Sequence, residues 1–259
     1  MQTDILPERM RQPMKKIVII GAGSAIFSLN LIKDLCLCDN LRDSAITLMD
    51  VNEARLGAIT GLCRRYAEET GHPLRIEQTT DRKQALNGAD FVINVALDYG
   101  HARLREGWEI ACRNGYRFGG SLHVVHDEAF WVNWHQLRLM ESILLDVLDI
   151  CPNAWYILVA NPVLAGITHL TRKYPQAKMV GMCHGFGGVY WLARQMGMDK
   201  RDITFECVGV NHFVWLTKLY HKGEDAPPHP RDWLDSKAAG YARTPGLSDG
   251  NGPKAVDLY

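Results

Sequence analysis

The stretch IVIIGAGS, from Ile17 to Ser24, decides the fold of this 259-residue chain. Four consecutive β-branched residues predict a short strand that is buried on both faces, as in a parallel sheet. The turn Gly21-Ala22-Gly23-Ser24 follows, and the pattern from residue 25 to about residue 38 predicts a helix. A Gly-x-Gly turn between a strand and a helix directs backbone N–H groups at a pyrophosphate. The stretch therefore predicts a dinucleotide site.

Strands and helices alternate along most of the remaining chain. Further strands are expected at residues 45–49, 74–77, 90–96, 155–160 and 178–182, and helices at 52–70, 81–86 and 127–150. This order predicts an α/β fold with a Rossmann-type doubly wound parallel sheet. Residues 203–208 and 213–220 alternate in hydropathy, which predicts antiparallel strands and the beginning of an α+β C-terminal domain.

Three segments are expected from these patterns. They are an N-terminal extension at 1–14, an NAD-binding domain at 15–182, and the incomplete start of a catalytic and substrate domain at 183–259. Residues 237–253 are rich in Gly, Pro, Ser and Asp, which predicts a mobile loop. Residues 253–259 read as a helix N-terminus with proline in its first turn, so we expect a truncated chain.

The composition bears on which partners and which cellular compartment to expect. Lys and Arg together number 29, as do Asp and Glu, so the balance gives no reason to expect nucleic acid or an anionic membrane. The polar start has no secretory signal, and no apolar run is long enough for a transmembrane helix. An odd number of cysteines, seven, without a disulfide framework predicts reduced thiols in a cytoplasmic protein.

Asp50 ends the second predicted strand, where a carboxylate can bind a ribose 2′-hydroxyl. Together with Gly21, Gly23 and Ser24 it predicts a site for NAD rather than NADP, whose 2′-phosphate Asp50 would repel. The third glycine of the usual motif is missing, because Ile26 and Phe27 occupy that region. The alternative is that the glycines form an ordinary tight turn and that Asp50 caps the next helix.

Cys183 and His212 are candidate ligands for a divalent transition metal. Cys183 closes a predicted strand, and parallel strands bind ligands at their carboxyl ends. Two protein ligands would leave positions for substrate oxygens and water. The alternative stays open, because a lone cysteine is usually a small buried hydrophobe and a lone histidine a structural residue.

Four motifs together resemble family 4 of the glycoside hydrolases. They are Gly21-Ala22-Gly23-Ser24, Ala160-Asn161-Pro162, Cys183-His184-Gly185 and Gly209-Val210-Asn211-His212, and the resemblance runs from about Lys15 to Tyr259. It implies enzymes that use NAD and a divalent metal, commonly manganese (Mn²⁺), on a carbohydrate substrate. Lactate and malate dehydrogenases share the glycine turn and an Asn-Pro strand end, but not the Cys-His-Gly and Asn-His pair.

The resemblance also implies roles for matching residues. Cys183 and His212 would hold the metal, Asn161 would contact the substrate near the nicotinamide, and Asn211 would contact a sugar hydroxyl. His184 stands where phospho-α-glucosidase relatives carry an acidic residue used as general acid. The catalytic residues expected on this basis are His184, Asn161 and Asn211.

Members with Cys-His at this point resemble enzymes for non-phosphorylated α-glycosides. The run from Arg117 to His123 is most similar to the α-galacturonidase-like branch, so α-galacturonides or α-glucosides are the expected substrates. The implied reaction is oxidation of the sugar at C3, elimination across C1 and C2, addition of water and reduction. A homo-oligomer, a dimer or tetramer, is also expected.

Two other functions remain open at this point. One is an NAD-dependent 2-hydroxy acid dehydrogenase, which would need a cationic carboxylate clamp and a general-base histidine. The other is an inactive NAD-binding fragment, because the resemblance places the candidate base after Tyr259.

Overall fold

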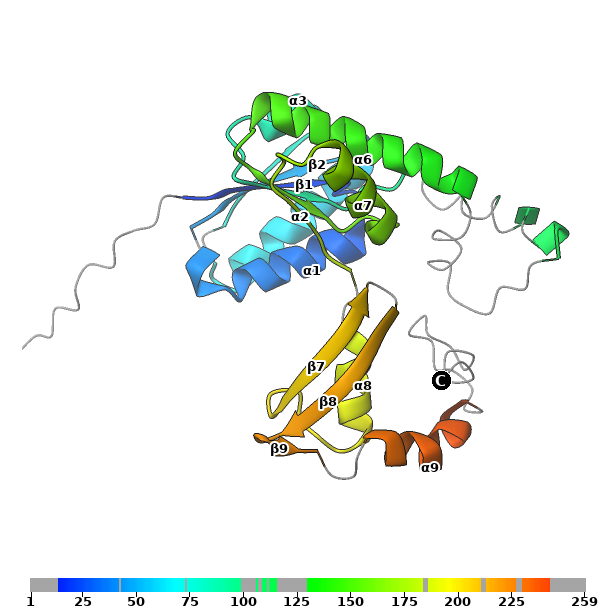
Figure 1. Cartoon of the computed structure of the whole chain (residues 1–259). Coiled ribbons are helices and arrows are strands. Elements are labelled where there is room, and N and C mark those ends of the chain that lie inside the picture. Colours follow the sequence, from blue (N-terminus) through cyan, green and yellow to red (C-terminus); the bar gives the residue numbers. More distant parts are fainter. Residues whose placement is uncertain are drawn as a thin grey trace, which may run out of the picture. The chain divides into compact units, whose positions relative to one another are not determined.

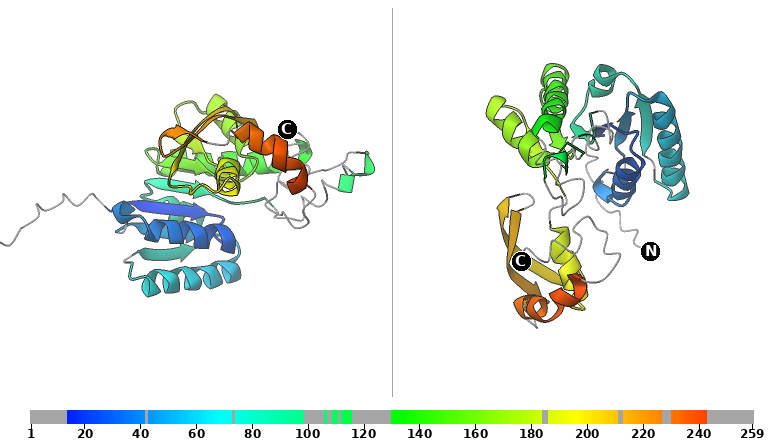
Figure 2. Two further views of the ribbon diagram at one scale, coloured as in Figure 1. Left: turned by 90° about the horizontal axis from the view of Figure 1, so that it is seen from below. Right: turned by 90° about the vertical axis from the view of Figure 1, so that its right-hand side faces the viewer.

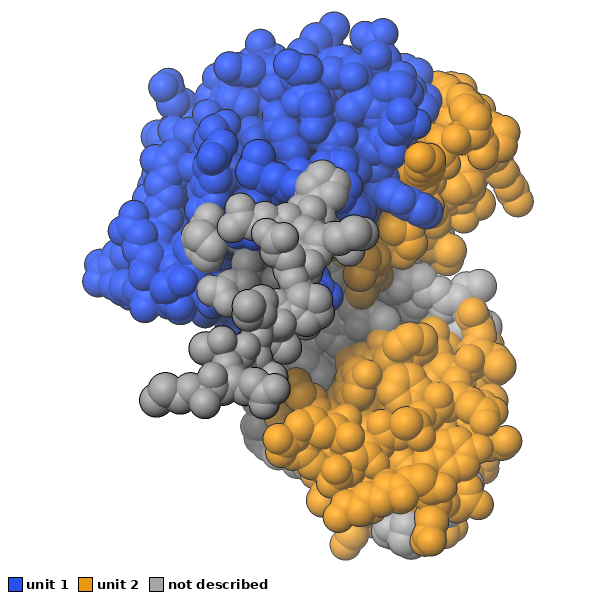
Figure 3. Space-filling view, turned by 90° about the vertical axis from the view of Figure 1, so that its left-hand side faces the viewer, with its two compact units in different colours: residues 1–96, 143–157 blue, residues 97–142, 158–259 orange. Residues whose placement is uncertain are grey.

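The computed structural model describes residues 14–41, 43–72, 74–98, 106, 109–110, 112–115, 130–183, 186–210, 213–226 and 230–242. Two compact units divide the chain, one of residues 1–96 and 143–157 and the other of residues 97–142 and 158–259 (Figure 3). The division falls within helix α6, Phe130–Ile150. The boundary expected between residues 182 and 183 stays a prediction.

A six-stranded parallel sheet confirms the predicted fold class (Figure 1). Its spatial order is β3-β2-β1-β4-β5-β6. The strands are β1 (Lys16–Ile20), β2 (Ala45–Met49), β3 (Arg75–Thr79), β4 (Phe91–Asn94), β5 (Trp155–Leu158) and β6 (Met179–Gly181). Chain order reverses between β1 and β4, which makes this pair the topological switch point where doubly wound sheets bind their ligands.

The first unit is built around β1. Its residues Ile17 to Ile20 are buried, and β1 pairs in parallel with β2 on one side and β4 on the other. Helices α1 (Ala25–Cys36) and α2 (Glu53–Glu69) cover one face of these strands, and the part of α6 that belongs to this unit covers the opposite face (Figures 1 and 2). The continuous apolar run is therefore explained by burial on both faces.

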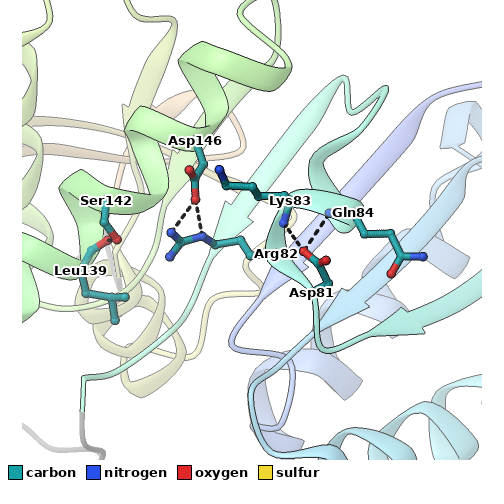
Figure 4. A network of polar contacts seen from close by, with 7 residues as sticks. All are labelled: Asp81, Arg82, Lys83, Gln84, Leu139, Ser142 and Asp146. Carbon is teal, nitrogen blue, oxygen red and sulfur yellow. Dashed lines mark hydrogen bonds and ion pairs between the residues drawn. The ribbon is translucent and has the colours of Figure 1, made fainter.

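An ion pair joins helix α3, Arg82–Leu86, to α6 within the first unit (Figure 4). Arg82 donates from Nε to Oδ2 of Asp146 at 2.7 Å. Asp81 caps α3, because its carboxylate accepts from the backbone N–H groups of Lys83 and Gln84 at 2.8 and 3.1 Å. Two stretches far apart in sequence are thus fastened together.

In the second unit, β7 (Ile203–Val210), β8 (Phe213–His221) and β9 (Glu224–Asp225) form an antiparallel sheet, as predicted for the first two strands. Helix α8 (Gly187–Gln195) covers one face of it. Their shared core contains Val189, Ala193, Met198, Ile203, Leu219 and Ala226. The small α+β domain expected from the sequence therefore begins here.

Three helices were not delineated from the sequence: α7 (Val163–Lys173), α8 and α9 (Pro230–Ala242). Residues 237–242, expected in a mobile loop, belong to α9, so that part of the prediction is wrong. Proline is favoured at the first position of a helix, and Lys and Ala propagate one well. Residues 243–253 lie outside the described part of the chain.

Glu141 of α6 connects α6 to α7 inside the second unit. Its carboxylate accepts from Lys173 Nζ at 2.5 Å and from the Tyr174 hydroxyl at 2.6 Å, and His169 Nε2 lies 3.5 Å away. The hydrogen bonds from Lys173 and then Tyr174 lower the pKa of Glu141 to about 2. The carboxylate is therefore ionised across the neutral range.

Candidate functional site

The glycine turn after β1 leaves no room for a side chain at Gly21. Gly21 has a φ of 90°, and a Cβ atom there would lie 2.5 Å from the Cα atom of Ala96. The N–H groups of Gly21 and Ala22 both donate to the carbonyl of Met49 at the end of β2, at 2.9 and 3.0 Å. The turn is consequently fixed between the end of β2 and the segment that follows β4.

Asp50 is held by the backbone on both carboxylate oxygens. Gly23 N–H donates to Oδ2 and Asn52 N–H to Oδ1, each at 2.8 Å. The cap of α2 is Asn52, which accepts from Arg55 N–H at 3.0 Å, so Asp50 is not the cap residue. Each carboxylate oxygen can accept more than one hydrogen bond, so a ribose hydroxyl can still bind Asp50.

The N-terminus of α1 begins directly after this turn. Ser24 is its N-cap residue and makes no side-chain cap bond among the described residues, and the first turn contains no acidic residue. Such a terminus keeps the partial positive charge that binds a phosphate group. Gly21, Gly23, Ser24 and Asp50 thus lie together in the first unit, and their contact with NAD stays a prediction.

Asn94 and Tyr156 form a buried polar pair that the sequence analysis missed. Both side chains are fully buried, and Asn94 Nδ2 donates to the Tyr156 hydroxyl at 2.7 Å. Burial raises the pKa of Tyr156, so its phenol stays protonated. The available signal was an amide residue at the end of the apolar run that forms β4.

Asn161 and Cys183 are brought together in the second unit. Asn161 follows β5 and Cys183 follows β6, and Cys183 Sγ lies 3.9 Å from Asn161 Oδ1. The N–H of Met182 donates to the carbonyl of Leu158 at 2.9 Å, which fixes the two strand ends beside each other. The Asn161–Pro162 peptide bond is cis.

The remaining predicted site residues, His184, Asn211 and His212, lie outside the described residues. The pairing of Cys183 with His212 therefore stays a prediction. Within the described part of the chain, no group of three His, Cys, Asp or Glu residues could hold a metal ion. An open hollow of about 680 Å³ is lined by six residues of α7, none of them a predicted site residue: Leu164, Ala165, Thr168, His169, Arg172 and Lys173.

Two further observations concern disulfide bonds and membrane-spanning helices. None of the seven cysteines forms a disulfide bond. No helix in the described ranges is both long and apolar enough to cross a membrane.

Comparison with known proteins supports the resemblance seen in the motifs. An α-glucosidase of Erwinia rhapontici is 31% identical over an alignment of 243 residues, and the match covers 90% of this chain and 52% of that enzyme. An α-galactosidase of Bacillus subtilis (strain 168) is 29% identical over 217 residues, 83% of this chain and 50% of that enzyme. The chain thus spans about half the length of these curated relatives.

A similar fold occurs in the crystal structure of a 6-phospho-α-glucosidase from gut microorganisms in complex with NAD and Mn²⁺. The TM-score is 0.78 at 19% identity, and the match covers 95% of this chain and 57% of that one. The sequence profile described as family 4 glycosyl hydrolase matches residues 16–198, which include the glycine turn, Asn161 and Cys183. The chain therefore belongs to family 4 of the glycosyl hydrolases.

Proposed function

We propose that this chain is the nucleotide-binding and metal-binding part of an α-glycosidase that depends on NAD and a divalent metal. The observation that carries the proposal is the pairing of Cys183 with Asn161 at adjacent strand ends in a chain of this family. The named relatives are an α-glucosidase and an α-galactosidase, which supports an α-glycoside as substrate, and other relatives are named α-galacturonidases; an α-glucoside or an α-galacturonide is therefore the proposed substrate class. The run 117–123 that favours the galacturonide lies outside the described residues.

The first unit fits NAD. The Gly21 turn lies at the switch point of the sheet, the start of α1 suits the pyrophosphate, and Asp50 offers carboxylate oxygens in a fixed orientation. Because the adenosine 2′-phosphate of NADP would face the same carboxylate, we expect the protein to prefer NAD.

The residues of the second unit fit a divalent metal by the chemistry of their donors. Cys183 offers a thiolate and His212 would offer an imidazole, a combination that suits transition metals. When bound, NAD supplies a reversible acceptor for the C3 hydrogen of the sugar, and the metal supplies an electrophile beside the oxidised carbon. Asn161 lies beside Cys183 and would orient the sugar through its amide, with Asn211 and His184 as further contacts.

A thiol-protection experiment tests the metal proposal without relying on turnover. Mn²⁺ should slow alkylation of Cys183 by iodoacetamide, because a coordinated thiolate is a poor nucleophile toward the reagent. Cys112, an exposed free thiol, is the matched internal control and should be alkylated equally fast with and without Mn²⁺. Equal labelling of Cys183 in both conditions would contradict the proposal, and His212→Ala should abolish the protection.

The dehydrogenase is the weaker alternative, because the family profile covers both the cofactor turn and the Asn161–Cys183 pair. The two functions differ in stoichiometry. A glycosidase of this kind uses NAD catalytically, whereas a dehydrogenase accumulates NADH in step with product.

The cellular setting belongs to the same proposal. Seven cysteines without a disulfide bond, one of them a proposed metal ligand, fit reducing conditions, which supports a cytoplasmic location. Assembly as a homo-oligomer, a dimer or tetramer, is also proposed, and sedimentation of the purified chain would test it.

A further inference from the structure

A chain of polar contacts runs from the interior of the first unit to the glycine turn. It begins at Tyr156 on β5, whose hydroxyl accepts from Asn94 Nδ2 at 2.7 Å. The opposite end of the Asn94 amide, Oδ1, accepts from the backbone N–H of Ala96 at 3.0 Å. Both ends of one buried amide are therefore used, and its orientation is fixed.

The segment that Asn94 holds is also tied to β1. Val95 N–H donates to the carbonyl of Ile20 at 2.9 Å, one residue before the glycine turn. Between them, these bonds fix the backbone of residues 94–96 against the end of β1.

Ala96 is the residue that lies against Gly21. A Cβ atom on Gly21 would lie 2.5 Å from Ala96 Cα and 2.6 Å from Ala96 N, so the two backbones touch with nothing between them. A small outward movement of Ala96 would relax the turn, and a small inward movement would collide with it. Ala96 thus sets the position of the turn together with the Met49 carbonyl, which accepts from Gly21 and Ala22.

This contact lies at the ends of β1 and β4, the strands between which chain order reverses. A ligand that binds at a switch point lies in the crevice between those two strand ends. We infer that Tyr156 and Asn94 are positioning residues for the cofactor: they hold Ala96 against Gly21 and so set the geometry of the NAD site. The inference rests on the proposed NAD dependence.

The stability of the sheet gives no reason for a polar pair here. A buried amide and phenol must be desolvated, and their hydrogen bonds largely offset that cost, so apolar residues of similar shape would stabilise the sheet about as well. The pair instead fixes the orientation of the Asn94 amide, because a hydrogen bond restricts both an angle and a distance, whereas apolar contacts do not.

Titration calorimetry of NAD binding tests the inference. Tyr156→Phe removes one hydroxyl and should raise the Kd for NAD by about threefold to tenfold, since Asn94 loses one of its two fixed partners. Asn94→Ala should raise the Kd at least as much. In the Asn94→Ala background, Tyr156→Phe should change the Kd no further, because two residues that act through one chain are not additive.

The control separates positioning from loss of stability. Ile59 is buried on α2 within the same unit, and Ile59→Val and Ile59→Ala should lower the Tm by different amounts. The variant whose Tm is nearer to that of Tyr156→Phe serves as the control, and it should bind NAD with the Kd of the unchanged chain. Hydrogen exchange at Ala96 should accelerate in Tyr156→Phe and stay unchanged in the Ile59 variants.

The outcomes are distinguishable. If the unchanged chain does not bind NAD, the proposed function and the inference both fail. If it binds NAD and Tyr156→Phe matches the Ile59 variants of equal Tm, or if the two site variants have additive effects, the inference alone is overturned.

Discussion

Asp50 illustrates how a single residue can serve the fold and the ligand at once. Two backbone N–H groups already bind its oxygens, so it is oriented before any cofactor arrives. Asp50→Ala should raise the Kd for NAD by about tenfold or more and the Kd for NADP much less, since a charge-assisted hydrogen bond is lost only for NAD. Equal affinity of the unchanged chain for both cofactors would refute this role.

A matched variant separates the two duties of Asp50. Asp50→Asn keeps one oxygen that can accept from Gly23 N–H but removes the charge. We expect it to keep the Tm of the unchanged chain more closely than Asp50→Ala does, while gaining affinity for NADP. Calorimetry with each cofactor and thermal unfolding of the three proteins provide the comparison.

Gly21 and Gly57 are expected to respond oppositely to alanine. Gly21→Ala forces a Cβ into the Ala96 backbone at a positive φ, and should destabilise the chain by about 1–3 kcal/mol. Gly57 lies within α2 with nothing within 4 Å of its would-be Cβ, so Gly57→Ala should stabilise by roughly 0.5–1 kcal/mol. Urea unfolding gives both values, and a shift of the same sign in both variants would be contrary to the structure.

At the scale of the element, the link between α6 and α7 predicts a dependence on pH. Glu141 has a folded-state pKa of about 2 against an ordinary value of 4.5, mainly because Lys173 and Tyr174 donate to it. Its contribution to stability is complete above the ordinary value, and is lost as pH falls through that value toward about 2.

The Glu141→Gln variant should therefore have a lower Tm than the unchanged chain near neutral pH, and the two Tm values should become equal in acid. The difference in Tm between the two proteins should shrink as the pH is lowered from about 5 to about 2. Glu69→Gln removes an exposed pair with Arg65 on α2 and serves as the control, with little change at any pH. A Glu141→Gln deficit that persists unchanged to pH 2 would rule out this account.

The elements that could be predicted from the sequence are those whose signal is local. Ile17 to Ile20 form a continuous apolar run, and a glycine turn ends it, so β1 and its turn follow directly from the residues. Helix α9 extends through residues 237–242, where a loop is expected from the sequence, because the Gly, Pro, Ser and Asp content of 237–253 as a whole hides the helix-forming Lys and Ala at its start. Trp233 of α9 meets the ring of Trp191 at 6.3 Å, a contact that no local pattern reveals.

The same distinction applies to the site. The glycine turn, Asp50, Asn161 and Cys183 stand in short motifs at strand ends, so their positions could be predicted locally, whereas their binding roles stay predictions. Asn94 and Tyr156 are 62 residues apart, and each looks like an ordinary strand residue on its own. Only the pairing of β4 and β5 in the folded sheet brings them together.

At the scale of the whole molecule, the proposed chemistry makes a prediction about the sugar. In an enzyme that contains this chain and has the full length of the relatives, elimination would remove the C2 hydrogen during turnover, so hydrolysis in deuterated water should place deuterium at C2 of the released sugar. Activity should require a divalent metal, NAD in catalytic amount and a reducing medium that keeps Cys183 available as a thiolate ligand. Mass spectrometry of the product measures the exchange.

Two results would contradict that mechanism in different ways. Product without deuterium at C2 indicates direct displacement between two carboxylates. NADH that accumulates in step with product indicates a dehydrogenase. We expect the 259-residue chain to bind NAD and to hydrolyse glycosides poorly, because it spans about half the length of the curated relatives.

The first unit is discontinuous in sequence, since residues 143–157 complete what residues 1–96 begin. The N–H of Trp155 donates to the carbonyl of Asp90, and Arg82 pairs with Asp146. In both contacts a residue of the segment 143–157 binds a residue that lies more than 60 positions earlier in the chain. During synthesis the ribosome must therefore deliver β5 before the first unit can close. Until then the nascent chain carries β4 with an open edge, and that interval is when a chaperone would have most to protect.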